Sequence, residues 1–328
     1  MNQTKVDEKY MRRCLQLAAN GRQNAKPNPM VGAVIVCDGR IIGEGYHIRC
    51  GEGHAEVNAF ASVSDEDGAL LCKSTLYVSL EPCSHYGRTP PCADLIINKG
   101  VKRVVVGCVD PFAKVHGRGI KKLQDAGIDV TVGILEKECM ELNKRFITFN
   151  THHRPYIILK WCQTANGFLD DNYKGVAISN PFTKMLSHKL RAENDAILIG
   201  RTTSARDHSQ LNVREWSGKD PLRIVIDRNN PFFSGLDFDK SVVPQILDEL
   251  YRRNIQSLIV EGGANTHQQF IDAGLWDEIR VETAFITVVN GTKAPILPNN
   301  VDIVVQKEYE GNVICSFCQS RQEPPPIL

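Results

Sequence analysis

The 328-residue sequence has no long run of lysine and arginine, and its 39 basic side chains are balanced by 38 acidic ones to a net charge of +1. Proteins that bind the phosphate backbone of nucleic acids usually concentrate positive charge in a patch or stripe. Nucleic acid is therefore a poor first candidate for a partner.

Long apolar segments are also missing. Residues 1–8 lack the apolar core of a secretory signal peptide. No apolar run reaches the roughly 20 residues that a membrane-spanning helix needs. These absences predict a cytoplasmic protein.

Eleven cysteines are present, but nothing in the sequence directs the chain to a compartment in which disulfides persist. Cys315 and Cys318 form the only C-x-x-C pair, and an isolated pair in an apolar stretch indicates core or edge positions rather than a metal site. Six others stand among apolar neighbours and are expected to act as small core residues: Cys14, Cys37, Cys72, Cys108, Cys139 and Cys162.

The length favours two domains, and 42% hydrophobic with 23% charged residues is ordinary for globular domains with full cores. The polar segment 150–155, after a helix expected to end near Arg145, marks the boundary. We therefore expect domains at residues 1–150 and 151–328, and we find no internal repeat.

In the first domain, apolar β-branched segments alternate with segments of helical periodicity. A helix is predicted over residues 7–20 with Asp7 as its cap, and Asp38-Gly39 predicts a tight hairpin turn. An α/β sheet of this kind places ligand sites at strand ends where helices begin. The other expected strands cover 30–37, 75–80, 101–109 and 128–132, and the other helices cover 55–63, a segment from Pro91, and 120–125.

The second domain shows a second α/β pattern that ends in β-rich sequence. The predicted strands cover 156–160, 196–199, 223–226 and a segment from Leu258. The predicted helices cover 181–192, 243–254 and a segment that begins near Asn265, and residues 201–216 are expected to form a loop.

The first domain contains a set of residues with metal-binding chemistry. One imidazole, His54, and two thiols, Cys83 and Cys92, are three ligands of the kind that zinc takes, which leaves a fourth tetrahedral position for water. Glu56 is not needed as a ligand, so it is free to move protons. The grouping matches the H-x-E … P-C … C signature of zinc deaminases. The alternative is a closed structural site in which His85 supplies the fourth ligand.

The motifs of the first half resemble the bifunctional deaminase–reductase of riboflavin biosynthesis. They are residues 27–34, 45–47, 54–56 and 81–92, and the long insert between Cys83 and Cys92 is a mark of that family. The resemblance implies a cytidine-deaminase-like α/β/α sandwich, then a dihydrofolate-reductase-like α/β domain. It also implies one zinc ion per chain, held by His54, Cys83 and Cys92, with Glu56 as the proton shuttle.

By the same resemblance, the substrate is a diaminopyrimidinone that carries a phosphoribosylamino group and loses a ring amine. Asn28, His85 and Arg88 match positions that meet this substrate, and His47 is a further candidate. An amide suits a pyrimidine edge, and a guanidinium suits a phosphate.

The second half resembles the family's reductase domain, which uses NADPH to reduce the ribosyl group to ribityl. From the residues alone, the Glu261–Thr266 turn could hold a phosphate at a helix start. The resemblance implies substrate contacts at Lys160, Arg191, Leu211, Arg214 and Glu261. It implies cofactor contacts at Cys162, Thr203, Asp207, Gly263, Ala264, Asn265, Thr266, His267, Gln268 and Gln269.

The second half of the chain departs from the family pattern at three places. The family's Asp-Asp-Pro loop reads Asp207-His208-Ser209, and Ala177 replaces an aromatic residue. Only about 30 residues separate Asp227 from Leu258, where relatives have a further strand.

The sequence thus predicts a bifunctional enzyme, with a homodimer implied by the resemblance. One alternative keeps the deaminase but makes the second domain a substrate-binding or dimerisation module without turnover. A second is a deaminase of nucleic-acid bases, and a third is a zinc-stabilised scaffold without catalysis.

Overall fold

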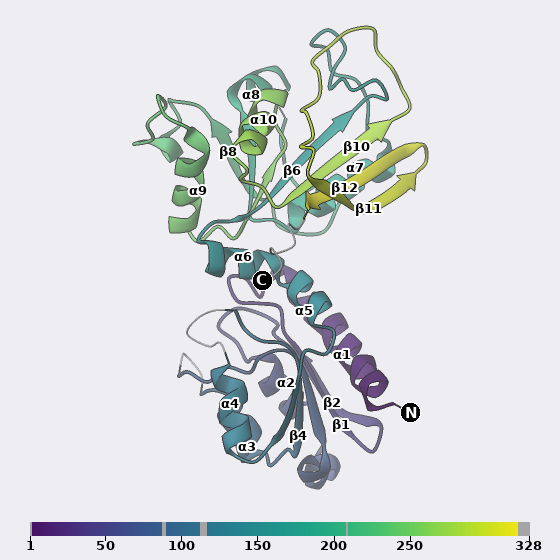
Figure 1. Ribbon diagram of the computed structural model, residues 1–328, viewed down its shortest axis with the longest axis vertical. Helices are drawn as coiled ribbons and strands as arrows, with labels where there is room; N and C mark the ends of the chain where they lie inside the picture. Colours follow the sequence, from purple (N-terminus) through teal and green to yellow (C-terminus); the bar gives the residue numbers. More distant parts are fainter. Residues whose placement is uncertain (1, 87–89, 112–116, 208, 321–328) are drawn as a thin grey trace, which may run out of the picture. The chain divides into compact units, whose positions relative to one another are not determined.

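The computed structural model describes residues 2–86, 90–111, 117–207 and 209–320 (Figure 1). The chain divides into two compact units, Met1–His152 and His153–Leu328. Each unit has its own sheet and its own buried core. Of the helices in the described ranges, none combines the length and apolar character that crossing a membrane requires.

The first unit is built on a five-stranded sheet with the order β2-β1-β3-β4-β5. β1 pairs antiparallel with both β2 and β3, whereas β3, β4 and β5 are parallel. The hairpin predicted at Asp38-Gly39 is confirmed, and both residues have the positive φ that this turn requires. The strands are β1 (Gly32–Cys37), β2 (Arg40–Tyr46), β3 (Thr75–Leu80), β4 (Arg103–Cys108) and β5 (Asp129–Val132).

Helices cover both faces of this sheet. One face packs against α2 (Ala55–Ala61), α3 (Cys92–Asn98) and α4 (Arg118–Asp125). The other face packs against α1 (Gln3–Ala19) and α5 (Glu136–Leu142). The unit ends with α6 (Lys144–His152), and the 3-10 segments are η1 (Asn20–Gln23) and η2 (Asp65–Lys73).

Three expectations for this unit were wrong. The first helix begins at Gln3 with Asn2 as its cap, so Asp7 lies inside the helix rather than at its start. The helix near the boundary continues past Arg145 to His152, because the polar residues 150–152 complete its last turn. Cys72 is exposed rather than part of the core, since it lies in η2, which has no buried residue.

The second unit is built on a seven-stranded sheet with the order β11-β12-β10-β6-β9-β7-β8. β10, β6, β9, β7 and β8 are parallel, and the hairpin of β12 and β11 adds antiparallel strands at one edge. The strands are β6 (Tyr156–Gln163), β7 (Ala196–Gly200), β8 (Leu222–Ile226), β9 (Ser257–Val260), β10 (Glu278–Ala284), β11 (Val301–Tyr309) and β12 (Asn312–Gln319).

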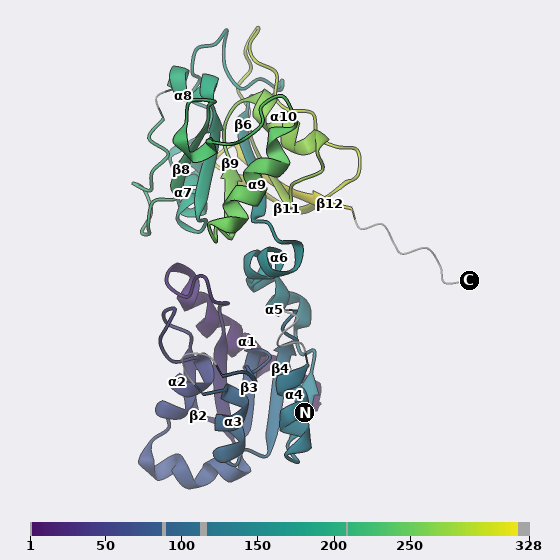
Figure 2. The ribbon, with the colours of Figure 1, turned by 90° about the vertical axis from the view of Figure 1, so that its left-hand side faces the viewer.

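The alternation of side chains along β6 separates the two faces of this sheet. Ile157, Leu159 and Trp161 pack with α9 (Val242–Arg252) and α10 (Ala264–Asp272), which lie on one face (Figure 2). Tyr156 and Ile158 pack toward α7 (Pro181–Ala192) on the other face. By the two-residue period of a strand, Lys160 and Cys162 belong to the α7 face.

Two findings concern the segments after β7 and β8. The expected loop at 201–216 was partly wrong, because Arg201–Asp207 forms the short helix α8 directly after β7. The segment between β8 and β9 folds as η3 (Pro231–Phe233) and α9, without a further strand, so β8 is the edge of the sheet.

Asp7 ties α1 to the sheet of the first unit. Its carboxylate is 2% exposed and accepts hydrogen bonds from Arg103 at 2.8 and 2.9 Å and from Tyr77 Oη at 2.9 Å. Burial raises the pKa of Asp7, but the hydrogen bonds from Arg103, Gln3 and Tyr77 outweigh burial and lower the pKa overall. The buried ion pair replaces the solvation that the carboxylate loses.

We predict that Asp7→Asn destabilises the first unit by about 2–4 kcal/mol, because it removes the buried carboxylate that accepts from Arg103 and Tyr77. Because the folded-state pKa of Asp7 is lowered, its contribution is present above the unfolded value of about 4 and is lost as the pH falls further. Calorimetry between pH 7 and pH 3 measures this effect. The difference in melting temperature between wild type and variant should become smaller as the pH falls. Glu8→Gln, on the same helix, serves as control, and equal melting temperatures for wild type and Asp7→Asn at pH 7 would contradict the assignment.

Candidate functional site

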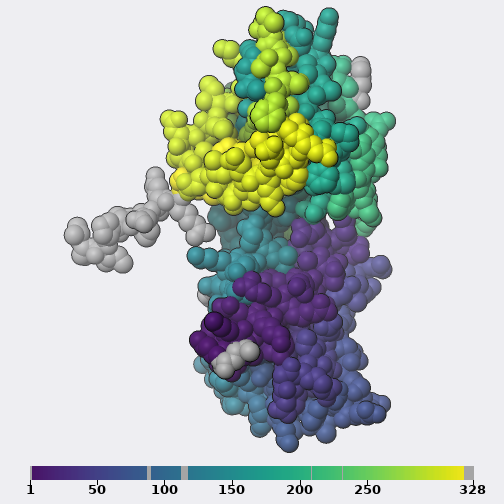
Figure 3. All heavy atoms as spheres, turned by 90° about the vertical axis from the view of Figure 1, so that its right-hand side faces the viewer, coloured from purple at the N-terminus to yellow at the C-terminus, as the bar shows by residue number. Residues whose placement is uncertain are grey.

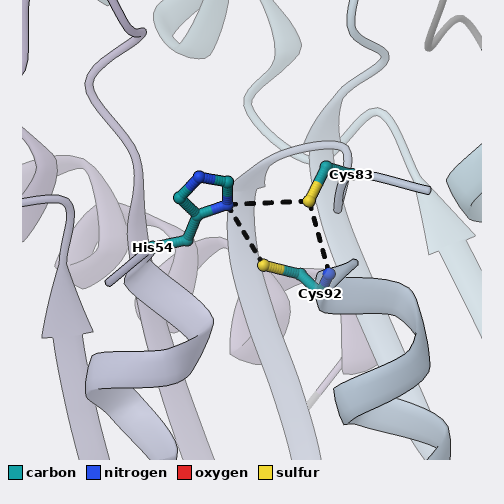
Figure 4. Close-up of side chains that lie close together, drawn as sticks. All are labelled: His54, Cys83 and Cys92. Atoms are coloured by element: carbon teal, nitrogen blue, oxygen red, sulfur yellow. Dashed lines mark hydrogen bonds between the residues drawn. The ribbon is translucent and has the colours of Figure 1, made fainter. Parts of the chain in front are cut away.

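The three proposed zinc ligands converge at the carboxyl end of β3. His54 is the N-cap of α2, Cys83 lies in the segment after β3, and Cys92 is the first residue of α3. The His54 Nδ1 atom lies 3.6 Å from the Cys83 sulfur and 3.3 Å from the Cys92 sulfur (Figure 4). All three ligand atoms lie within 4.8 Å of one another.

This spacing fits a zinc ion. With Zn–S of about 2.3 Å and Zn–N of about 2.0 Å, tetrahedral geometry separates sulfur and nitrogen ligands by about 3.5 Å. The two observed separations, 3.6 and 3.3 Å, lie on either side of that value. Within the described ranges, these residues form the only group of three or more His, Cys, Asp or Glu side chains with metal-binding spacing.

The two thiols are unequal. A hydrogen bond from Cys92 lowers the pKa of Cys83 to about 4, with help from His54 and from the Cys92 backbone N–H at 3.3 Å. The same shared bond, together with burial, raises the pKa of Cys92. Cys83 is thus the readily formed thiolate of the pair, and binding a cation through both sulfurs would release a proton from Cys92.

Glu56 lies in the first turn of α2, close to the ligands. Its side chain is 3% exposed, and burial raises its pKa to about 7, with a further contribution from the charge of Cys83. Its carboxyl group hydrogen-bonds with Cys92. A buried carboxyl of this kind can hold or release a proton close to neutral pH.

A cavity of about 270 Å³ opens beside these residues. Of the sequence-predicted residues, the structure brings His54, Glu56 and Cys83 together with Asn28, His47 and His85 in its lining. Arg88 lies outside the described residues. The remaining lining residues are Pro29, Val31, Ala55, Leu80, Glu81, Asp110, Phe146 and Asn150.

Asn28 and His47 form a pair at the cavity wall. Asn28 Nδ2 lies 3.1 Å from His47 Nε2, and His47 Nδ1 lies 3.1 Å from the Gly53 carbonyl oxygen. The carbonyl oxygen can only accept, so Nδ1 carries the proton, and Nε2 accepts from the Asn28 amide. Burial lowers the pKa of His47, which agrees with this neutral form. The pairing leaves the Asn28 carbonyl oxygen as the acceptor that a ligand could meet.

Sequence reasoning missed Glu81 as a functional residue. Its carboxylate is 4% exposed and accepts backbone N–H groups from Gly117 and Gly119, at 2.9 and 2.8 Å, and from Asp110 and Ile120. Gly119 approaches the Pro82 carbonyl too closely for any side chain. Glu81 thereby binds the start of α4 to the segment that carries Cys83. The sequence did offer a signal for Glu81, because its carboxylate stands directly before Pro82-Cys83 at the end of a strand.

Asp110, Phe146 and Asn150 were also missed. Asp110 follows β4, the strand next to β3, so its position at the same sheet edge could have been expected. Phe146 and Asn150 belong to α6, where the Asn150 amide donates to the Phe146 carbonyl oxygen at 2.8 Å. The preceding helix was expected to end near Arg145 and residues 150–155 to form a polar boundary, so neither Phe146 nor Asn150 was considered as part of a site.

In the second unit, the structure joins several of the predicted substrate residues. Arg191 on α7 forms a two-point ion pair with Glu261, with N···O distances of 2.7 and 3.1 Å. The Glu261 side chain is 7% exposed, and the charge of Lys160 acts on it together with that of Arg191. Leu211 is buried in the core with a positive φ, and Arg214 donates to Asn212 Oδ1 at 3.0 Å.

The predicted cofactor residues lie mainly at the start of α10. Gly263 is the N-cap of this helix, with φ of 59°, and a side chain there would crowd Thr203 Oγ1 of α8. Asp207 ends α8. The segment Ala264, Asn265, Thr266, His267, Gln268 and Gln269 forms the first turns of α10.

Two of the predicted cofactor residues, His267 and Cys162, use their side chains in contacts within the protein. His267 is 1% exposed, and its ring nitrogens face the carbonyl oxygens of Gly263, Lys160 and Val260, so only its backbone could meet a cofactor. Cys162 is hydrogen-bonded to Lys160 and Glu282.

Two family profiles match the chain. "Cytidine and deoxycytidylate deaminase zinc-binding region" covers residues 4–108, and "RibD C-terminal domain" covers residues 155–306. The riboflavin biosynthesis protein RibD of Aquifex aeolicus is 38% identical over 84% of this chain and 86% of its own length. The protein of the same name from Escherichia coli is 37% identical over 85% of this chain and 87% of its own length.

Solved structures agree with these relatives. A diaminohydroxyphosphoribosylaminopyrimidine deaminase/5-amino-6-(5-phosphoribosylamino)uracil reductase from Thermotoga maritima has a TM-score of 0.88 and 32% identity. The match covers 97% of this chain and 100% of that one. RibD of Acinetobacter baumannii has a TM-score of 0.86 and 28% identity, with the same coverage.

The ligand set predicts which cysteines are needed for metal. Cys83→Ala and Cys92→Ala should each lower the zinc content from one ion per chain to a small fraction, because two protein ligands hold zinc poorly. Mass spectrometry of the metal in purified, dialysed protein measures this. Cys72→Ala, which removes an exposed thiol, should retain full zinc, and full zinc in either ligand variant would remove that cysteine from the set.

Proposed function

The chain belongs to the RibD family of riboflavin biosynthesis proteins, and on this premise we propose how its residues carry out two successive reactions. It is a bifunctional enzyme with a zinc-dependent deaminase domain followed by a reductase domain. The specific substrates and residue roles below are our proposals.

We assign the first reaction to the cavity beside His54, Cys83 and Cys92. The substrate is 2,5-diamino-6-(5-phosphoribosylamino)pyrimidin-4(3H)-one, which loses its ring amine as ammonia. A zinc ion, when bound there, acts as a Lewis acid that lowers the pKa of water from about 15.7 to about 7. The observation that carries this assignment is the placement of the buried Glu56 carboxyl beside three ligand atoms with zinc spacing.

Glu56 moves the protons of this reaction. Its carboxylate takes a proton from the attacking water as the water oxygen bonds to the ring carbon. It then returns a proton to the amine nitrogen as the carbon–nitrogen bond breaks and ammonia leaves. General acid–base work of this kind contributes about 100- to 10,000-fold in rate.

Asn28, His47, His85 and Arg88 recognise the substrate. The Asn28 carbonyl oxygen accepts from a ring N–H or amine, and His47 keeps the amide in that orientation by accepting from Asn28 Nδ2. His85 lines the cavity and is itself exposed, which suits a contact with the polar ribosyl phosphate. For Arg88, the role in binding the phosphate rests on the resemblance and on guanidinium chemistry.

We assign the second reaction to the carboxyl ends of the parallel strands β6, β7 and β9 of the second domain. NADPH supplies the hydride that converts the ribosyl group to ribityl. Lys160 stabilises the negative charge that develops on the sugar oxygen as the ring opens, while Arg191 and Glu261 orient the substrate with Leu211 and Arg214. The residues at the start of α10, with Thr203 and Asp207, would hold the cofactor, because backbone N–H groups at a helix start suit its phosphates.

One experiment tests both reactions. The wild-type protein, given the diaminopyrimidinone phosphate and NADPH, should release ammonia and oxidise NADPH. Glu56→Gln should keep its zinc but lower ammonia release by about 100-fold or more, since the amide cannot carry the proton. It should also stop NADPH oxidation until the deaminated intermediate is supplied, which should restore oxidation to the wild-type rate.

Glu52→Gln, an exposed change near the same helix, is the control and should behave like wild type. Ammonia release by Glu56→Gln at the wild-type rate would remove its role as proton shuttle. Ammonia release by the wild type without NADPH oxidation from either substrate would make the second domain a module without turnover. Deamination of a cytosine or adenine oligonucleotide in preference to the pyrimidinone would favour the nucleic-acid alternative.

We also propose a cytoplasmic homodimer that associates through the second domain. β11 is an edge strand whose Ile303, Val304 and Val305 side chains are exposed, and its surface with β12 is seen in yellow in Figure 3. An exposed apolar edge strand is suited to pairing with a second chain.

Sedimentation measures this assembly. The wild type should sediment as a dimer, and Ile303→Lys should shift it to monomer, because a charge would be buried in the interface. Ile41→Lys, which changes an exposed isoleucine of the first unit, should leave the dimer intact. A monomeric wild type at micromolar concentration would end the proposal.

A further inference from the structure

Glu282 on β10 is a buried carboxylate that no motif marks. It is 2% exposed and stands directly opposite Cys162 in the register of β10 and β6. Its Oε1 accepts from Thr183 Oγ1 and from Asn312 Nδ2, each at 2.6 Å. Its Oε2 accepts from Ser179 Oγ at 2.8 Å and from the Cys162 sulfur at 3.2 Å. Four donors from four segments therefore converge on one side chain.

This environment keeps Glu282 ionised. Burial raises its pKa, but the hydrogen bonds from Thr183 and Asn312, and the charge of Lys160, lower the pKa overall. A carboxylate that accepts several hydrogen bonds is stabilised in its charged form. Replacing the carboxylate by an amide would put an NH₂ group where one oxygen now accepts.

A single thiol links this carboxylate to Lys160. Lys160 Nζ donates to the Cys162 sulfur at 3.1 Å, and the thiol in turn donates to Glu282. Burial raises the pKa of Cys162, so the side chain keeps the proton that it donates. Lys160 is itself 9% exposed, and such burial alone would favour its neutral form.

The charges around Lys160 balance only if Glu282 is counted. Glu261 is held at both oxygens by Arg191, and the charge of Lys160 also favours its ionised form. Lys160 faces the second carboxylate, Glu282, through the thiol. His267 of α10 also lies nearby, with its Nε2 atom 3.2 Å from the Lys160 carbonyl oxygen, and both of its ring nitrogens face carbonyl oxygens. Without Glu282, two buried cations would share one carboxylate.

We propose that Glu282 is the counter-ion of Lys160 and a positioning residue of the reductase site, acting through the Cys162 thiol. This role rests on the proposed reduction in the second domain, where Lys160 must be an ammonium to stabilise charge on the sugar oxygen. Glu282 does not touch the substrate. It sets the charge and the position of the side chain that does.

The test compares Glu282→Gln with wild type by two readouts. The first is trace acetylation of Lys160 by acetic anhydride, measured by mass spectrometry of the peptide, because only the neutral amine reacts. Glu282→Gln should acetylate Lys160 about ten times faster at pH 9, since losing the counter-ion lowers the lysine pKa. The second readout is NADPH oxidation with the deaminated substrate, whose alkaline limb should move to lower pH.

Three further variants test whether the Cys162 link causes the change in acetylation rate. Cys162→Ala removes the link and should also speed acetylation, whereas Cys162→Ser keeps a group that can accept and donate, and should retain the wild-type acetylation rate. Glu308→Gln, which removes an exposed carboxylate from β11, should retain the wild-type rate as well. If circular dichroism shows that Glu282→Gln does not fold, Cys162→Ala decides: faster acetylation supports the link, and an unchanged rate overturns it.

Equal acetylation rates and superimposed pH profiles for wild type and a folded Glu282→Gln would overturn the inference. Failure of the proposed reductase activity would give a different result from failure of the counter-ion role. A wild type that oxidises no NADPH with the deaminated substrate would remove the reductase proposal, while the acetylation rates would still decide whether Glu282 is the counter-ion.

Discussion

The close approach of His54, Cys83 and Cys92 is the constraint on which the first domain depends. Three segments must meet at one sheet edge, and the helices α2 and α3 both begin there. Helix starts favour negative charge, which suits thiolates. Glu81 accepts hydrogen bonds from backbone N–H groups at the start of α4. The segment that carries Cys83 is therefore fixed between β3 and α4. The cavity and Glu56 take their positions from this arrangement.

The second domain follows the same rule with different groups. Its proposed reaction site contains two cations and two carboxylates with little solvent exposure, and such charges are tolerated only as partners. Arg191 forms an ion pair with Glu261, and a thiol links Lys160 to Glu282. In both domains, these cysteines contact polar or charged side chains: the Cys83 and Cys92 sulfurs lie beside His54, and the Cys162 sulfur links Lys160 to Glu282.

Local signals predicted much of this fold. The spans of β3 and α7 agree with their predicted residues, because apolar runs and an Asn-Pro helix start are encoded within a few residues. The motif spacing likewise predicted three metal ligands, and the structure brings these residues together. Long-range pairings were not accessible in this way. Three of the four partners of Glu282 are 99 to 120 residues distant, and no pattern within β10 reveals which strand will lie beside it. Asp7 was read as a helix cap for the same reason, since its partner Arg103 lies on β4.

The central claim is that one chain exchanges a ring amine for oxygen and then reduces the sugar. Mass spectrometry of the product formed in ¹⁸O-labelled water, with zinc-loaded protein, NADPH and the diaminopyrimidinone phosphate, tests it most directly. The account predicts a single final product with one ¹⁸O atom in place of the amine and two added hydrogens. A product that retains both amines, or one that gains oxygen while its sugar stays unreduced, would contradict it.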